Sequence, residues 1–292
     1  MNVAQAVDHM RPSIVQVAFL AVGLSREFLQ QVGHPFVHTC LGTAFLVNSD
    51  GYAVTARHVV ESGRRLAGRF AGQILAGPSG MVAGLALPNT ESMRGNFKDV
   101  GFDLVDEDAA HDLALLKLSP NPFSGEVRSG FVTNGQEVPF LLGTATLNPS
   151  RPRDGDAVGV SGYPLRQTVL VTNAGWMATS WSFEIAEAAV PGAPQLFRTP
   201  DIADTFLADL EANPGNSGGP VYLIESASVI GVCVGSMPSP VWDQDGNPAR
   251  TDTQELFYSS GLTVVVPVRY VIDLLSKYGL SWSESTKSSG RE

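Results

Sequence analysis

The sequence predicts an all-β protein whose strands fall into two halves. Its 292 residues include 30 glycines and 19 prolines, and short apolar runs lie between these turn-forming residues. A stretch rich in Pro, Asn, Gly and Ser, residues 119–156, separates the runs into two sets. A chain of this length can bury a sizeable core in one large domain or in two halves packed together.

The first half contains two long strand candidates, PSIVQVAF (12–19) and GTAFLVNS (42–49). The stretch NSDGYAVTARHVV (48–60) predicts a strand, an Asp-Gly turn, a second strand and a short helical turn. A further apolar strand, HDLALLKL (111–118), has Asp112 near its start. These runs predict one set of strands before the separating stretch.

The second half restarts at DGDAVGVSGYPL (154–165) and continues through NPGNSGGPVYLI (213–224) and SVIGVCVGS (228–236). One helix is expected near its end, because Pro267 suits a first helical position and Gly279 suits a C-terminal cap. Apolar residues between them recur at helical spacing. We expect an N-terminal arm at 1–11, a first unit at 12–120, a connection at 121–154, a second unit with the helix at 155–280 and a flexible polar tail at 281–292.

The composition argues against several functions and locations. A formal net charge of −10 gives nucleic-acid binding no electrostatic basis. No stretch is long enough to span a membrane, and the N-terminus lacks the pattern of a signal peptide. Cys40 and Cys233 have no metal-binding spacing and are expected to be buried free thiols. These features together predict a cytoplasmic protein.

The stretch NPGNSGGPVY (213–222) raises the question whether Ser217 is a turn residue or a nucleophile. It matches the nucleophile elbow of α/β-hydrolases, but there the catalytic histidine follows the serine, and here none does. An order with the acid first would leave only Asp8 and Asp50, without a supporting motif. The order His, Asp, Ser remains. The five histidines are His9, His34, His38, His58 and His111.

Three of the histidines have simple structural interpretations. His34 and His38 lie in the loop VGHPFVHT with no acidic or cysteine partner in the motif, so no metal site is expected there. His111 alternates to the opposite strand face from Asp112 and is rejected as the base. No cofactor is expected anywhere in the chain.

Three ordered stretches, GTAFLVNSDGYAVTARHVV (42–60), HDLALLKL (111–118) and NPGNSGGPVY (213–222), resemble the active-site blocks of trypsin/chymotrypsin-like serine proteases. The likeness is greatest to the high-temperature-requirement branch and related bacterial trypsin-like peptidases, and it spans roughly residues 12–275. The resemblance implies two antiparallel β-barrels of the six-stranded type, with the C-terminal helix appended. It also implies that His58 is the general base, Asp112 its orienting acid and Ser217 the nucleophile.

The resemblance assigns further roles around Ser217. The oxyanion hole is implied at Gly215, Asn216 and Ser217, with N–H donors from the first and last and Asn216 supporting the turn. Substrate binding is implied at Val234, Gly235 and Glu211. Glu211 lies six residues before Ser217, where a carboxylate at the floor of the specificity pocket would favour a basic residue. A surface position for Glu211 is the simpler interpretation.

The chain also departs from the family pattern. It has no activation sequence of the Ile-Val-Gly-Gly type, and it ends soon after the terminal helix, so no C-terminal peptide-binding domain is expected. We therefore expect a metal-independent serine endopeptidase acting on a protein or peptide, with a possible activating partner or self-assembly. Two alternatives stay open: a catalytically silent or partner-activated binding protein that keeps the protease fold, and an ester hydrolase.

Overall fold

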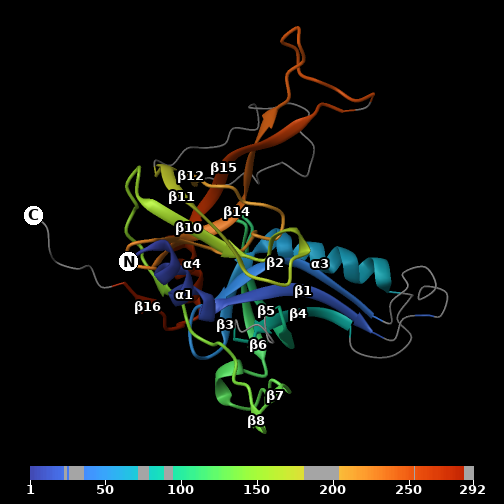
Figure 1. The fold of residues 1–292 in the computed structure, drawn as a ribbon, viewed down its shortest axis with the longest axis vertical. Coiled ribbons are helices and arrows are strands. Elements are labelled where there is room, and N and C mark those ends of the chain that lie inside the picture. The colour runs from blue at the N-terminus through green and yellow to red at the C-terminus, as the bar shows by residue number, and fades with distance from the viewer. Residues whose placement is uncertain are drawn as a thin grey trace, which may run out of the picture.

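Two β-barrels make up most of the computed structural model, which describes residues 1–22, 25, 36–71, 79–88, 95–180, 204–252 and 254–285 (Figure 1). Both barrels are antiparallel and six-stranded, and a helix follows the second, which confirms the predicted fold class. His34 lies outside the described residues.

The first barrel closes in the strand order β1-β2-β3-β6-β5-β4, with β1 pairing antiparallel to β4 to complete the ring. Strands β1 and β6 are buried along nearly their whole length, on both faces, and most of their buried side chains are apolar. The strands are β1 Ile14–Val22, β2 Phe36–Leu46, β3 Tyr52–Ala56, β4 Ser79–Ala86, β5 Phe97–Asp108 and β6 Leu113–Ser119.

The second barrel has the order β13-β10-β11-β12-β15-β14 and is closed by the pairing of β13 with β14. Strands β14 and β15 continue beyond the barrel as a two-stranded arm, seen in orange at the top of Figure 1. The strands are β10 Ala157–Gly162, β11 Val171–Thr179, β12 Phe206–Asp209, β13 Pro220–Leu223, β14 Val229–Pro240 and β15 Phe257–Pro267.

Short strands add to these barrels. A small hairpin pairs β7 (Val132–Thr133) with β8 (Gln136–Glu137). The second barrel is extended by β9 (Thr146–Leu147) and β16 (Ser283–Glu284), which pair in parallel. The start of the segment expected to be a loose polar tail is therefore joined to the sheet through main-chain hydrogen bonds, which its polar side chains did not indicate.

Among the described residues, three α-helices lie around the barrels. Helix α4 (Val268–Lys277) is confirmed at its predicted place, followed by Gly279 at a φ of +63°. Helix α1 (Val3–Met10) lies within the expected arm and begins with a capping box of Asn2 and Gln5. Helix α3 (Arg57–Phe70) has 14 residues where the sequence predicted only a short helical turn. The 3₁₀ turns are η1 Arg11–Ser13, η2 Pro122–Ser124 and η3 Pro164–Arg166.

Helix α3 is long because it packs against the first barrel. Val59 and Val60 are fully buried, and Gly63 lets the helix approach β4, since a Cβ there would lie 2.2 Å from the sulfur of Met81. Its arginines face outward. Within the part of the chain that the structure describes, no helix is long and apolar enough to cross a membrane.

Candidate active site

His58 is the second residue of α3, directly after strand β3. Its ring Nδ1 lies 2.6 Å from Oδ2 of Asp112, and its main-chain N–H donates to Oδ1 of Asp112 at 2.9 Å. Asp112 is 4% exposed, whereas the His58 side chain is 36% exposed. With the carboxylate accepting from Nδ1–H, the other ring nitrogen is left as a proton acceptor on the accessible side.

The backbone of Asp112 is held in an uncommon conformation. Its φ is +53°, in the left-handed region that few residues other than glycine, asparagine and aspartate adopt. Its carbonyl accepts the N–H of Arg57 at 2.8 Å, at the first residue of α3. The conformation therefore turns both the carbonyl and the carboxylate of Asp112 toward the start of this helix.

Ser217 lies in the turn between β12 and β13, and this turn packs against the first barrel. The carbonyl of Ser217 accepts the N–H of Thr43 at 2.9 Å. Gly218 approaches the end of β3 so closely that a Cβ there would lie 2.7 Å from the nitrogen of Ala56, two residues before His58. The three predicted blocks thus meet where the two barrels join.

Gly42 lies between the histidine helix and the serine turn. A Cβ at this position would come within 2.6 Å of Val59 and 2.8 Å of the carbonyl oxygen of Ser217. Only glycine permits this approach. Among the described residues the Ser217 hydroxyl makes no hydrogen bond.

The turn before Ser217 leaves two main-chain donors without a partner. The Pro214 carbonyl accepts from the N–H of Leu165 at 2.7 Å, and the Asn216 N–H donates to the Asn213 carbonyl at 2.9 Å. The N–H groups of Gly215 and Ser217 donate to no residue that the structure describes. An oxyanion hole requires main-chain donors that are left free in this way.

Gly215 adopts a φ of +107°, and a Cβ on it would lie 2.3 Å from the Tyr163 carbonyl oxygen. Its own carbonyl accepts from the Thr43 hydroxyl at 2.7 Å. Asn216 is 1% exposed, and its N–H closes the turn instead of facing the free donors. Of the three residues assigned to the hole, Gly215 and Ser217 therefore offer N–H groups, and Asn216 shapes the turn.

A family model described as a trypsin-like peptidase domain matches residues 42–232, a range that contains the paired His58 and Asp112 and the Ser217 turn. The chain belongs to the trypsin-like peptidase family. No curated protein matches it.

Solved structures of an HtrA-type protease have a fold similar to that of this trypsin-like peptidase. The protease AlgW with a decapeptide matches with a TM-score of 0.53 and 18% identity, over 95% of this chain and 67% of that one. A variant of AlgW with a tripeptide matches with a TM-score of 0.50 and 18% identity, over 95% and 63%. The chain thus spans about two thirds of the length of these proteins, and the likeness at this identity is one of fold.

The predicted specificity residues lie in two different environments. The Glu211 side chain is exposed between buried Leu210 and Ala212, and its carbonyl accepts from the Asn173 side chain. Within the described residues it therefore lies at the surface, not at a pocket floor. Val234 is 3% exposed, and a Cβ on Gly235 would meet nothing within 4 Å.

Residues that sequence reasoning missed connect the two barrels of this trypsin-like peptidase. The Thr43 hydroxyl donates to the Gly215 carbonyl and accepts the N–H of Tyr163 at 3.0 Å. Its signal in the sequence was its place directly after Gly42 in the histidine block. Tyr163 lies in the predicted stretch DGDAVGVSGYPL (154–165), and its carbonyl lies against Gly215.

The two cysteines are both free thiols. Cys233 is buried, as predicted, and burial raises the pKa of its thiol to about 12. Its carbonyl accepts the N–H of Gly218 at 2.7 Å, so it supports the serine turn. Cys40 is half-buried, with its sulfur 3.4 Å from the Tyr163 carbonyl oxygen.

Proposed function

We propose that this serine peptidase of the trypsin-like fold is an endopeptidase that cleaves peptide bonds through Ser217. His58 would accept the hydroxyl proton as Ser217 attacks the scissile carbonyl carbon, and then donate it to the leaving amine. Asp112 would fix the tautomer and stabilise the imidazolium. Water would release the acyl group in a second, equivalent step. The 2.6 Å contact between His58 and Asp112 is the single observation that carries this proposal.

The free N–H groups of Gly215 and Ser217 support a resting enzyme that is ready to react. Negative charge develops on the carbonyl oxygen during attack, and donors fixed in advance stabilise it without reorganisation. The Pro214 carbonyl is already hydrogen-bonded to Leu165 and is turned away from these donors. This conformation favours the peptidase over the alternative of a silent or partner-activated binding protein.

A peptide substrate is proposed to bind along β14. The ladder between β13 and β14 ends at Val232, and beyond it β14 pairs within the described residues with β15 alone. An extended peptide could therefore add as a strand beside Val234 and Gly235, because no described atom lies within 4 Å of the Cβ position of Gly235. The matched AlgW structures carry a decapeptide and a tripeptide, which is consistent with a peptide as substrate class.

The proposal is tested by comparing purified wild type with Ser217→Ala on a panel of fluorogenic peptides with Arg, Val or Phe before the scissile bond. We expect Ser217→Ala to lose roughly six orders of magnitude in kcat/KM, down to the detection limit, with thermal unfolding unchanged. Ser281→Ala, at an exposed position far along the chain, is the matched control and should retain activity. Cleavage by Ser217→Ala at the wild-type rate would show that the mechanism is wrong.

Ester substrates distinguish the proposed endopeptidase from the alternative of an ester hydrolase. Parallel kinetics on a peptide and on the ester of the same acyl group give two values of kcat/KM for one acyl-enzyme. An endopeptidase cleaves both at rates that depend equally on Ser217. Turnover of the ester alone, with no peptide on the panel cleaved, would identify the chain as an ester hydrolase.

A further inference from the structure

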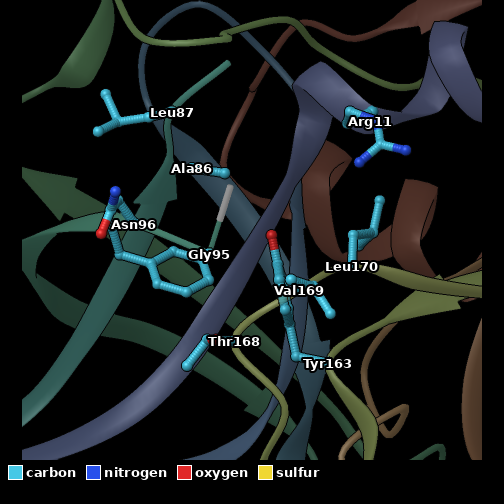
Figure 2. Close-up of a pocket in the computed structure, with 10 residues that line it drawn as sticks. Arg11, Ala86, Leu87, Gly95, Asn96, Tyr163, Thr168, Val169 and Leu170 are labelled. Carbon is cyan, nitrogen blue, oxygen red and sulfur yellow. The ribbon is translucent and has the colours of Figure 1, made fainter. Parts of the chain in front are cut away.

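A cavity of about 70 Å³ lies between the two barrels, next to Tyr163 (Figure 2). Because one water needs roughly 10–15 Å³ on this measure, the cavity has room for about five waters or a small organic molecule. Figure 2 shows Ala86 and Asn96 of the first barrel on one side and Arg11 and Leu170 on the other. The side chains that matter for its chemistry are those of Arg11, Asn96, Phe97, Tyr163, Thr168 and Leu170.

The cavity is positively charged. Arg11 is the one charged residue among the described residues that line it, and its guanidinium makes no ion pair or hydrogen bond with any described residue. Burial raises the pKa of Tyr163, and the charge of Arg11 acts in the opposite direction. The tyrosine hydroxyl is therefore a neutral hydrogen-bond donor that interacts electrostatically with the guanidinium of Arg11. The Thr168 hydroxyl adds a further donor, and none of the described residues that line the cavity is an acid.

Part of the lining is apolar. Phe97 packs edge-on against the Tyr163 ring, with 5.4 Å between the ring centroids, and Leu170 also lines the cavity (Figure 2). A ligand that matches the cavity needs one negative group for Arg11 and a short apolar body for Phe97 and Leu170. A guanidinium fork fits a planar carboxylate with two parallel hydrogen bonds. A branched carboxylate of about six non-hydrogen atoms fits both the charge and the size.

Tyr163 connects this cavity with the turn around Gly215. Its side chain lines the cavity, whereas its carbonyl oxygen lies where a Cβ of Gly215 would come within 2.3 Å. Its N–H donates to the Thr43 hydroxyl, which in turn donates to the Gly215 carbonyl at 2.7 Å. A ligand that contacts the buried Tyr163 ring would therefore add contacts to the residue against whose main chain Gly215 packs.

The same cavity is formed by both barrels. Arg11 precedes β1 and Phe97 begins β5, whereas Thr168 and Leu170 precede β11. A direct link lies nearby, because the Gln16 side-chain amide of β1 donates to the Gln167 carbonyl at 3.2 Å. A ligand in the cavity would add contacts across the same boundary over which Thr43 and Ser217 pair.

We propose that this cavity is an effector site for a small branched aliphatic carboxylate, bound by Arg11, and that its occupancy stabilises the Gly215 loop with both N–H donors free. Binding of the carboxylate does not depend on the proposed peptidase function. The effect on turnover, a higher kcat at unchanged KM, rests on the proposed peptidase function.

Binding is tested by calorimetric titration of isobutyrate into folded Ser217→Ala protein, which removes any dependence on catalysis. Isobutyrate should bind, and its neutral isostere isobutyramide should bind at least tenfold more weakly. Arg11→Gln should weaken isobutyrate binding at least tenfold. Arg128→Gln removes the same charge from an exposed residue and should leave binding unchanged. Ala86→Leu, which fills the cavity from β4, should also abolish binding and provides a second test if Arg11→Gln does not fold.

Several results would overturn the proposal. Absence of isobutyrate binding to the folded protein, or equal binding by Arg11→Gln, would show that the cavity does not bind a carboxylate through Arg11. Binding of sulfate as tight as that of isobutyrate shows a general anion site and contradicts the carboxylate assignment. Isobutyrate that binds wild type without raising kcat on a cleaved peptide contradicts the coupling to Gly215. A wild type that binds isobutyrate but cleaves nothing contradicts the proposed function and leaves the binding result intact.

Discussion

Asp112 holds His58 through two different groups of the histidine. Its Oδ1 accepts the main-chain N–H at 2.9 Å, and its Oδ2 lies 2.6 Å from the ring Nδ1. The residue before the helix, Ala56, provides no side-chain cap for α3. Asp112 supplies that cap from 54 residues away and also orients the ring. A single carboxylate thus links the stability of the helix to the position of the proposed base.

Substitutions at Asp112 and His58 should therefore differ in stability although both lose activity. Asp112→Ala removes the helix cap and should lower the free energy of unfolding by about 1–2 kcal/mol. His58→Ala keeps the main-chain contact and should cost less. Asp112→Asn retains an acceptor for the His58 N–H but cannot hold the right tautomer, so kcat should fall roughly 10⁴-fold. Denaturant unfolding and peptide kinetics measure the two effects. Equal stability of the two alanine variants would contradict the capping role.

Gly215→Ala should damage catalysis more than stability. The left-handed φ and the carbonyl of Tyr163 leave no room for a Cβ, so the loop must shift and carry its N–H away from the oxyanion. We expect a loss of about 10²–10³-fold in kcat with KM little changed. Gly125→Ala is the matched control, because Gly125 has a φ of +79° with nothing near its Cβ position. It should cost about 1 kcal/mol of stability and no activity. Full activity of Gly215→Ala would exclude its N–H as an oxyanion donor.

Thr43→Val should uncouple the turn around Gly215 from the first barrel, to which Thr43 belongs. It preserves shape but leaves the Gly215 carbonyl and the Tyr163 N–H without their partner, which should cost about 1–3 kcal/mol. The loss should appear in kcat as well as in thermal unfolding, because the loop holds the proposed donors. Thr43→Ser keeps the hydroxyl and should retain most of the wild-type kcat and most of the wild-type thermal stability. A serine variant as impaired as the valine variant would point to packing instead of hydrogen bonding.

Glu211→Gln should leave the residue preference unchanged, since the side chain is exposed between buried neighbours. The ratio of kcat/KM for peptides with Arg or Val before the scissile bond is the quantity to measure. A selective fall for the Arg peptide in the variant would instead place this carboxylate in the specificity pocket.

The order His, Asp, Ser could be predicted from the sequence because no histidine follows Ser217, whereas the choice of His58 and Asp112 rested on the resemblance of their stretches to the active-site blocks of trypsin-like proteases. The strands and helix α4 followed from turn residues and apolar spacing. The length of α3 could not be predicted from these patterns. Gly63 and Gly68 disfavour a helix locally, and its stability comes from burial of Val59 and from a cap supplied by Asp112. Such contacts exist only once the barrel has formed.

The links around the serine turn could not be predicted for a similar reason. Thr43 contacts Gly215 and Tyr163, which are 172 and 120 residues away, and no local pattern records those pairings. The pairing of β16 with β9 uses main-chain groups alone, so its polar side chains gave no indication of it. Periodicity predicts which face of an element is buried, but not which distant group meets it.

The central claim is that Ser217 is activated by His58 in the resting protein, and labelling with a fluorophosphonate tests it most directly. The reagent reacts with an activated serine, and mass spectrometry of the digested protein identifies the modified residue. We predict stoichiometric labelling of Ser217 in the wild type without any added partner, and none in His58→Ala. An unlabelled Ser217 in folded wild-type protein, or equal labelling in His58→Ala, would contradict the account.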